Sequence, residues 1–126
     1  MRKTEPQLPD EGLRRISPPC TQRDPLDPDD LQRAAFLAKS LSDGNRLRIL
    51  QLVARDPKSV SSIVEESGLS QPLVSHHLKE LKRSLLVRVE RRGPFVYYQL
   101  SDARVLDVLE VLRDMAWDLL LTRRTF

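Results

Sequence analysis

The sequence predicts a small, mostly helical domain with one β-hairpin, and three observations lead to this class. Apolar side chains recur at helical spacing in five segments between residues 29 and 122. A short connection that contains a glycine, at residues 68–70, joins the third segment to the fourth. Two runs of alternating apolar and polar residues flank the turn Gly93–Pro94 and precede the last segment. Four helices, a hairpin and a final helix, in that order, are typical of a winged helix-turn-helix fold.

One folded domain is expected to account for most of the chain. A length of 126 residues suits a single core. The first 28 residues hold six of the nine prolines among charged side chains, a composition typical of a flexible tail. We therefore expect a proline-rich N-terminal tail over residues 1–28, the folded domain over 29–122 and a short C-terminal tail over 123–126.

The first two helices are placed by their caps and by a proline. Two aspartates at the start of the segment 29–41 favour a helix N-terminus there, because carboxylates stabilise the positive end of the helix dipole. Ser42 or Asp43 can cap the second helix. This helix has to end before Pro57, because the residue preceding a proline resists helical geometry.

The third and fourth helices form the predicted helix-turn-helix. Ser59 can cap the short third helix, and Gly68 supplies a left-handed residue at its end. Ser70 can cap the fourth helix, over residues 71–84, whose first turn tolerates a proline. The apolar residues of the fourth helix are spaced to form one stripe: Val74, Leu78, Leu81 and Leu85. We expect this stripe to be buried and the opposite face to be polar and basic.

The hairpin and the last helix complete the domain. Val87 begins the first predicted strand, and Leu100 ends the second. Ser101 can cap the last helix, which is expected to run to about Thr122. Apolar residues cover more than one face of this helix, which is more apolar surface than one small core can hide. The last helix is therefore expected to meet a partner surface.

The fourth helix has the properties of a helix that reads the major groove of DNA. Its width fits the groove, its hydroxyl and amide groups can meet base edges, and its ammonium groups can meet phosphates. The predicted contacts from this helix are Ser70, Gln71, Ser75, His76, Lys79 and Lys82. Three arginines near the hairpin turn offer a second contact, with the DNA backbone or the minor groove: Arg88, Arg91 and Arg92. The sequence thus predicts a protein that binds a double-stranded DNA operator.

Three motifs between residues 37 and 100 are specific: SDGNRLRIL, SQPLVSHHLKEL and VYYQL. The stretch that contains them closely resembles the ArsR/SmtB family of bacterial winged-helix repressors. The resemblance implies a homodimer joined through the first and last helices, with reading helices in successive major grooves of a palindromic operator. It also implies that a ligand relieves repression. The protomers are expected to meet at Leu31, Ala35, Val108, Val111, Leu112, Met115 and Leu119.

Two metal sites known in that family are altered in this sequence. Members that bind metals through thiolates carry Cys-x-Cys at the start of the third helix, where this chain has no cysteine over residues 58–62. Other members use carboxylates and histidines of the last helix, and the matching positions here are Asp102, Arg104, Met115 and Asp118. Two carboxylates without imidazoles make a poor zinc site. We expect neither metal site to function, and no cofactor.

Two histidines and a cysteine have both a structural and a functional interpretation. His76 and His77 are adjacent, so on a helix they point about 100° apart and cannot chelate one metal ion. His77 lies nearer the apolar stripe and is expected to pack, whereas His76 faces outward. Cys20, the single cysteine, is either an exposed thiol without a function or a redox switch in which two protomers link or react.

Other functional classes are disfavoured by what the sequence contains. It has no glycine-rich phosphate loop, nucleophile elbow or cluster of carboxylates with a base, so an enzyme is not expected. No segment approaches the roughly 18 apolar residues of a membrane span, the first residues do not form a signal peptide, and a single cysteine suits a reducing compartment. We expect a cytoplasmic protein. The alternative is a winged-helix module that binds a protein instead of DNA. Such a module would be expected to lack the basic face of the fourth helix and the arginine-rich hairpin, and both are present here.

The signal that controls DNA binding has three candidates. They are an organic metabolite bound between the protomers, a thiol reaction at Cys20, and no ligand at all, with control through the amount of protein.

Overall fold

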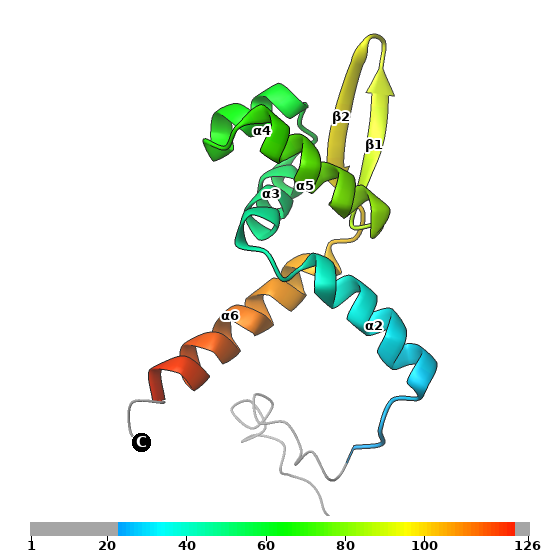
Figure 1. The fold of residues 1–126 in the computed structure, drawn as a ribbon, viewed down its shortest axis with the longest axis vertical. Helices are drawn as coiled ribbons and strands as arrows, with labels where there is room; N and C mark the ends of the chain where they lie inside the picture. The colour runs from blue at the N-terminus through cyan, green and yellow to red at the C-terminus, as the bar shows by residue number, and fades with distance from the viewer. Residues whose placement is uncertain (1–22, 123–126) are drawn as a thin grey trace, which may run out of the picture. The chain divides into compact units, whose positions relative to one another are not determined.

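The computed structural model describes residues 23–122 and shows, in this range, five helices and one two-stranded sheet. The helices are α2 (Pro28–Ser40), α3 (Gly44–Arg55), α4 (Val60–Ser67), α5 (Gln71–Arg83) and α6 (Arg104–Thr122), and the strands are β1 (Val87–Arg92) and β2 (Phe95–Leu100) (Figure 1). This order confirms the predicted winged helix-turn-helix fold. Cys20 and residues 123–126 lie outside the described residues.

Side-chain caps begin three of the helices at the predicted places. The Asp43 carboxylate accepts two backbone N–H groups at the start of α3, whereas the hydroxyl of Ser42 donates to a carbonyl of the preceding turn. Ser59 and Ser70 cap α4 and α5 in the same way. Gly68 ends α4 with a φ of 77°, a left-handed conformation that glycine adopts without a steric penalty. Short-range hydrogen bonds therefore determine where the helix-turn-helix begins and turns.

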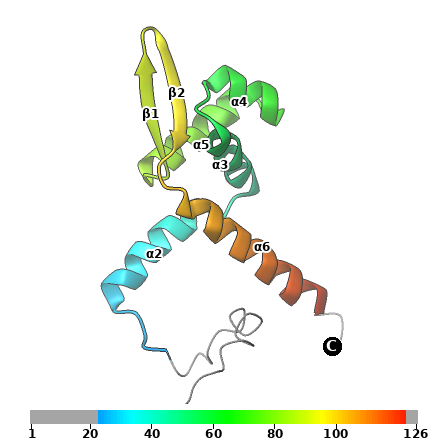
Figure 2. The ribbon, with the colours of Figure 1, turned by 180° about the vertical axis from the view of Figure 1, so that it is seen from behind.

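The core lies where α3, α4, α5 and the hairpin meet. Helix α3 packs against α4, α5 and β2, and α5 also packs against α4 and β1. Figures 1 and 2 view the chain from opposite sides, and both show α5 against α3 with the hairpin beside them. The largest fully buried side chains are Ile49, Leu50, Val53, Ile63, Val74, Leu78 and Leu81. Burying one such side chain contributes roughly 1.5–3 kcal/mol, so this cluster accounts for much of the fold's stability.

The hairpin is a regular antiparallel pair that is tied to the loop before α4. Its register runs from Val87 opposite Leu100 to Arg92 opposite Phe95. Lys58 adds a bridge to the outer side of β2, because its backbone N–H and carbonyl bond those of Tyr98 at 2.9 and 2.8 Å. The wing is thus held by the helix-turn-helix as well as by its own turn.

The predicted burial of Leu85 is wrong. Helix α5 ends at Arg83, and Leu85 has a φ of 66° and a side chain that is 75% exposed. The left-handed residue turns the chain into β1, so that Leu86 takes the buried place with 5% exposure. The spacing i, i+4, i+7 and i+11 predicted burial of Leu85 wrongly because the helix ends before this residue.

The predicted cap of the last helix is also wrong. Helix α6 begins at Arg104, and the Asp102 carboxylate, not the Ser101 hydroxyl, accepts the N–H of Arg104 at 2.9 Å. The backbone N–H of Ser101 instead donates to the carbonyl of Leu86 at 3.0 Å. Ser101 is therefore still tied to the residue that precedes β1, and the helix starts later than expected.

Helices α2 and α6 bury little of their own surface. Helix α2 has no buried residue, and Val105 is the buried apolar residue of α6. Large apolar side chains of both helices are more than two fifths exposed, among them Phe36, Val111 and Trp117. Within residues 23–122, no helix combines the length and the apolar character that crossing a membrane would require.

Candidate nucleic-acid interface

The outer face of α5 is uncovered in the described part of the chain. All six side chains predicted to contact DNA from this helix and its cap are exposed: Ser70, Gln71, Ser75, His76, Lys79 and Lys82. Helix α5 also exposes Leu73, which the sequence analysis did not assign. The exposure of Leu73 could have been predicted from the sequence, because Leu73 lies outside the apolar stripe of its helix.

The opposite face of α5 anchors the helix in the core. Val74 and Leu81 are fully buried, Leu78 is 2% exposed, and all three belong to the core cluster. The first turn is held by the hydroxyl of Ser70, which accepts the N–H of Leu73 at 3.3 Å, and by Pro72. Because Oγ of Ser70 acts there as an acceptor, its O–H can still donate to a DNA phosphate or base. A helix fixed at its start and along its back loses little backbone entropy when its outer side chains bind.

His77 is packed on the inner face of α5, as predicted, at 4% exposure. Neither ring nitrogen has a hydrogen-bond partner within residues 23–122, and Nε2 lies 3.9 Å from Oδ1 of Asp43. Burial lowers the pKa of His77, and this effect outweighs the attraction of Asp43. The imidazole is therefore neutral near pH 7 and has a structural position, whereas the neighbouring His76 faces outward.

The three arginines of the wing are all exposed, but they do not share one face. Successive residues of a strand point to opposite sides. Arg88 and Arg92 therefore lie on one face of β1, and Arg91 lies on the face that carries the buried Val87. The three arginines are equivalent in their distance from the turn, but the alternation of the strand separates them.

Arg92 is occupied by neighbours, and Arg91 is not. The guanidinium of Arg92 donates to both carboxylate oxygens of Glu90 at 3.2 Å and lies 5.0 Å from the centre of the Tyr97 ring. The side chains of Arg88 and Arg91 make no hydrogen bond or ion pair with other residues in the range 23–122. Arg91 is consequently available to a phosphate without breaking an existing bond.

The residues predicted to join two protomers are exposed in the single chain. Leu31 and Ala35 lie on the outside of α2. The exposed fractions on α6 range from 44% to 61% for Val108, Val111, Leu112, Met115 and Leu119. Phe36 and Trp117 add exposed apolar area, at 52% and 68%. Such an area on one small domain is typical of a protein interface.

Two of the positions that match the family's metal ligands, Asp102 and Arg104, form an ion pair here. Arg104 bonds the Asp102 carboxylate at 2.7 Å and lowers its pKa to about 2. Near the start of α4, the ammonium of Lys58 lies 2.8 Å from Asp56 and 3.1 Å from Glu66. Within residues 23–122, no three histidine, cysteine or carboxylate side chains are grouped as a metal site would require.

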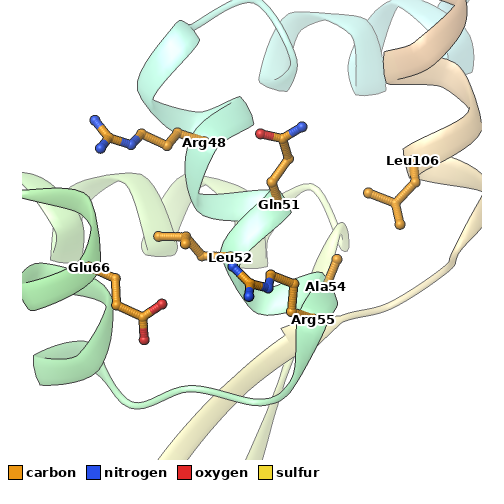
Figure 3. Close-up of a pocket in the computed structure, with 7 residues that line it drawn as sticks. All are labelled: Arg48, Gln51, Leu52, Ala54, Arg55, Glu66 and Leu106. Atoms are coloured by element: carbon orange, nitrogen blue, oxygen red, sulfur yellow. The ribbon is translucent and has the colours of Figure 1, made fainter.

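A hollow of about 520 Å³ lies along α3, and Figure 3 shows the side chains around it. Its lining comes from α3, α4 and the first turn of α6: Arg48, Gln51, Leu52, Ala54, Arg55, Glu66 and Leu106. None of the residues predicted to contact DNA lines it. Its volume falls in the range of small-molecule sites, and its walls combine guanidinium and amide groups with leucines.

Comparisons with known proteins agree with this geometry. Residues 43–89 match the family model described as bacterial regulatory protein, arsR family. The chain is 35% identical over 100 residues to the probable mercury resistance operon repressor of Streptomyces lividans. The aligned region covers 79% of this chain and 74% of that protein. It is 36% identical over 76 residues to the arsenical resistance operon repressor of Staphylococcus aureus, over 60% of this chain and 73% of that protein.

A solved structure is similar over most of the chain. It is the homodimeric winged helix-turn-helix DNA-binding domain Mb0332 from Mycobacterium bovis, with a TM-score of 0.63 and 30% identity. The similarity covers 74% of this chain and 91% of that domain.

Proposed function

Because this chain belongs to the ArsR family of bacterial regulatory proteins, we propose that it represses transcription by binding a palindromic DNA operator as a homodimer. The observation that carries this proposal is the outer face of α5. Its hydroxyl, amide, imidazole and ammonium groups are exposed together, and its apolar face is buried against α3. This is the division of surfaces that major-groove reading requires.

The proposed contacts divide into two groups. Gln71, Ser75 and His76, near the start of α5, read base edges, because the N-terminal residues of a recognition helix enter the groove deepest. Lys79 and Lys82, together with the hydroxyl of Ser70, bind phosphates and position the helix. The wing adds Arg88 and Arg91, with Arg92 contributing less because Glu90 already pairs with it.

The homodimer is supported by the exposed apolar side chains of α2 and α6. Val108, Met115 and Leu119 are examples from α6, and leaving them in water would be unfavourable. A twofold dimer buries the same patch on both copies and places two reading helices on one side of the DNA. The related domain from Mycobacterium bovis is homodimeric. Half-site centres are then expected about 10 base pairs apart.

The control of this repressor is proposed to be independent of the family's two metal sites. Arg104 donates to both oxygens of the Asp102 carboxylate, and a bound cation would have to displace this bidentate guanidinium. A small organic effector is a better match to the hollow along α3, which offers guanidinium and amide groups beside leucines. We propose a cytoplasmic regulator without enzymatic activity.

Selection of binding sites from random double-stranded DNA with the full chain tests this function. The expected result is a palindrome whose half-sites are about one helical turn apart. A matched variant, Ser75→Ala, should weaken binding and relax the preference at one base pair of each half-site. Enrichment of no sequence above the starting pool would contradict the proposal, and a single non-repeated half-site would contradict the dimer.

A further inference from the structure

Leu73 is an apolar side chain on the otherwise polar outer side of the reading helix. It is 37% exposed, whereas Val74, the next residue, is fully buried. Leu73 is not among the half-buried apolar residues that pack against the core cluster. The other exposed positions of α5 are one proline and polar side chains: Gln71, Pro72, Ser75, His76, Lys79, Lys82 and Arg83.

The position of Leu73 is fixed by its own backbone. Its N–H donates to the Ser70 hydroxyl at 3.3 Å, and Pro72 restrains the same turn. Leu73 and His76 are i, i+3 neighbours, so they lie on one row of the helix surface. Leu73 is exposed in the first turn of α5 and lies in the same row as His76, a predicted base contact. If α5 enters the major groove, Leu73 therefore enters it too.

The major groove offers one apolar group to such a side chain. Among the four bases, thymine alone carries a methyl group, at C5, and it projects into the major groove. We propose that Leu73 packs on the C5 methyl group of one thymine in each half-site and thereby makes this chain prefer thymine to cytosine there. This inference rests on the proposed function, since it requires that α5 enters the major groove.

Deoxyuridine tests the contact, because it pairs as thymidine does and lacks only the methyl group. The full chain is titrated against the selected operator and against duplexes in which one thymine per half-site is replaced, at constant salt. We expect one replacement to weaken binding about fourfold per half-site, the effect of losing one buried methyl group. Leu73→Ala should bind the thymine and the uracil duplexes equally.

Two further variants control for the fold of the helix. Leu85→Ala removes another exposed leucine, just beyond the other end of α5, and should keep the full effect of the methyl group. Leu73→Met retains an apolar side chain and should keep most of it. Thermal unfolding of each variant checks that the domain is folded, and the deoxyuridine series on the natural chain needs no variant at all.

The outcomes separate the two proposals. Operator binding that is insensitive to every replacement, or a selected half-site that contains no thymine, overturns the contact and leaves the proposed function intact. Sensitivity that survives in Leu73→Ala assigns the methyl contact to another residue and also overturns it. Absence of binding to any selected DNA overturns the proposed function, and this inference with it.

Discussion

Adjacent arginines at the wing are predicted to contribute differently to DNA binding. The guanidinium of Arg92 donates two hydrogen bonds to the Glu90 carboxylate and lies over the Tyr97 ring. Arg91 points to the opposite face of β1 and has no ion pair within the described residues. Arg91→Ala therefore removes a cation that is available to a phosphate. Arg92→Ala removes a cation that Glu90 already largely neutralises.

The magnitude follows from counterion release. Each phosphate contact contributes about 0.9 to the slope of log K against log salt. A homodimer carries Arg91 twice, so Arg91→Ala should reduce the slope by about 1.8. Over a roughly fourfold increase in salt, this changes the loss of affinity by about twelvefold. Arg92→Ala should change the slope less, and Glu90→Gln should make it steeper by releasing Arg92.

The assay is a fluorescence anisotropy titration of the selected operator at several potassium chloride concentrations. Arg55→Ala provides the control, because Arg55 is an exposed arginine of α3 that lines the hollow and is not a predicted DNA contact. Equal reductions of the slope in Arg91→Ala and Arg92→Ala would refute the argument from the Glu90 pair. An unchanged slope in Arg91→Ala would remove the wing from the interface.

Four other predictions address the reading helix, the dimer and the stability of the fold. Ser75→Ala and His76→Ala should each weaken operator binding by about 1–3 kcal/mol and relax the base preference, whereas an equal loss on all sequences, measured in the same titration, would show that they read no base. Met115→Glu should convert the dimer to monomers in analytical ultracentrifugation, because it places charge in an apolar interface, and an unchanged mass would argue against α6 as the interface. Leu85→Gly should raise the free energy of unfolding by up to about 1 kcal/mol, since glycine adopts the left-handed conformation that is unfavourable for leucine. Leu81→Ala should lower the free energy of unfolding by about 2–5 kcal/mol. Denaturant unfolding measures both values, and destabilisation by Leu85→Gly would show that the backbone of Leu85 is not strained. NMR titration should give Asp102 a pKa of about 2, below 3.8, because Arg104 favours the ionised carboxylate. The contribution of this pair to the stability of the fold is then present above pH 3.8 and is lost as the pH falls through about 2. Arg104→Ala should return the pKa of Asp102 toward 3.8.

Some features of the site were predictable because they depend on residues close together in the chain. A capping hydroxyl bonds an N–H three residues later, so Ser59 and Ser70 could be assigned from spacing alone. The left-handed position at Gly68 follows from its missing Cβ. The buried members of the α5 stripe follow from helical periodicity, which also identified its outer face.

Other features depend on contacts that spacing does not encode. After α5, Leu86 is buried and Leu85 is exposed. Helical spacing does not predict this, because the path of β1 along the core decides where the helix ends. Asp102 replaced Ser101 as the cap because the backbone N–H of Ser101 donates to Leu86, the residue just before β1.

The sequence by itself determined the two faces of the helix that we propose to read DNA, since an amphipathic segment with a cap at its start specifies its own buried and exposed faces. Only the tertiary structure decided which of its neighbours are available to act. The pairing of β1 with β2 placed the Tyr97 ring beside the guanidinium of Arg92, and the packing of the core took in Leu86 in place of Leu85. The physical reason is range: caps and periodicity act over three or four residues, whereas contacts between strands and the walls of a core are set by the fold as a whole.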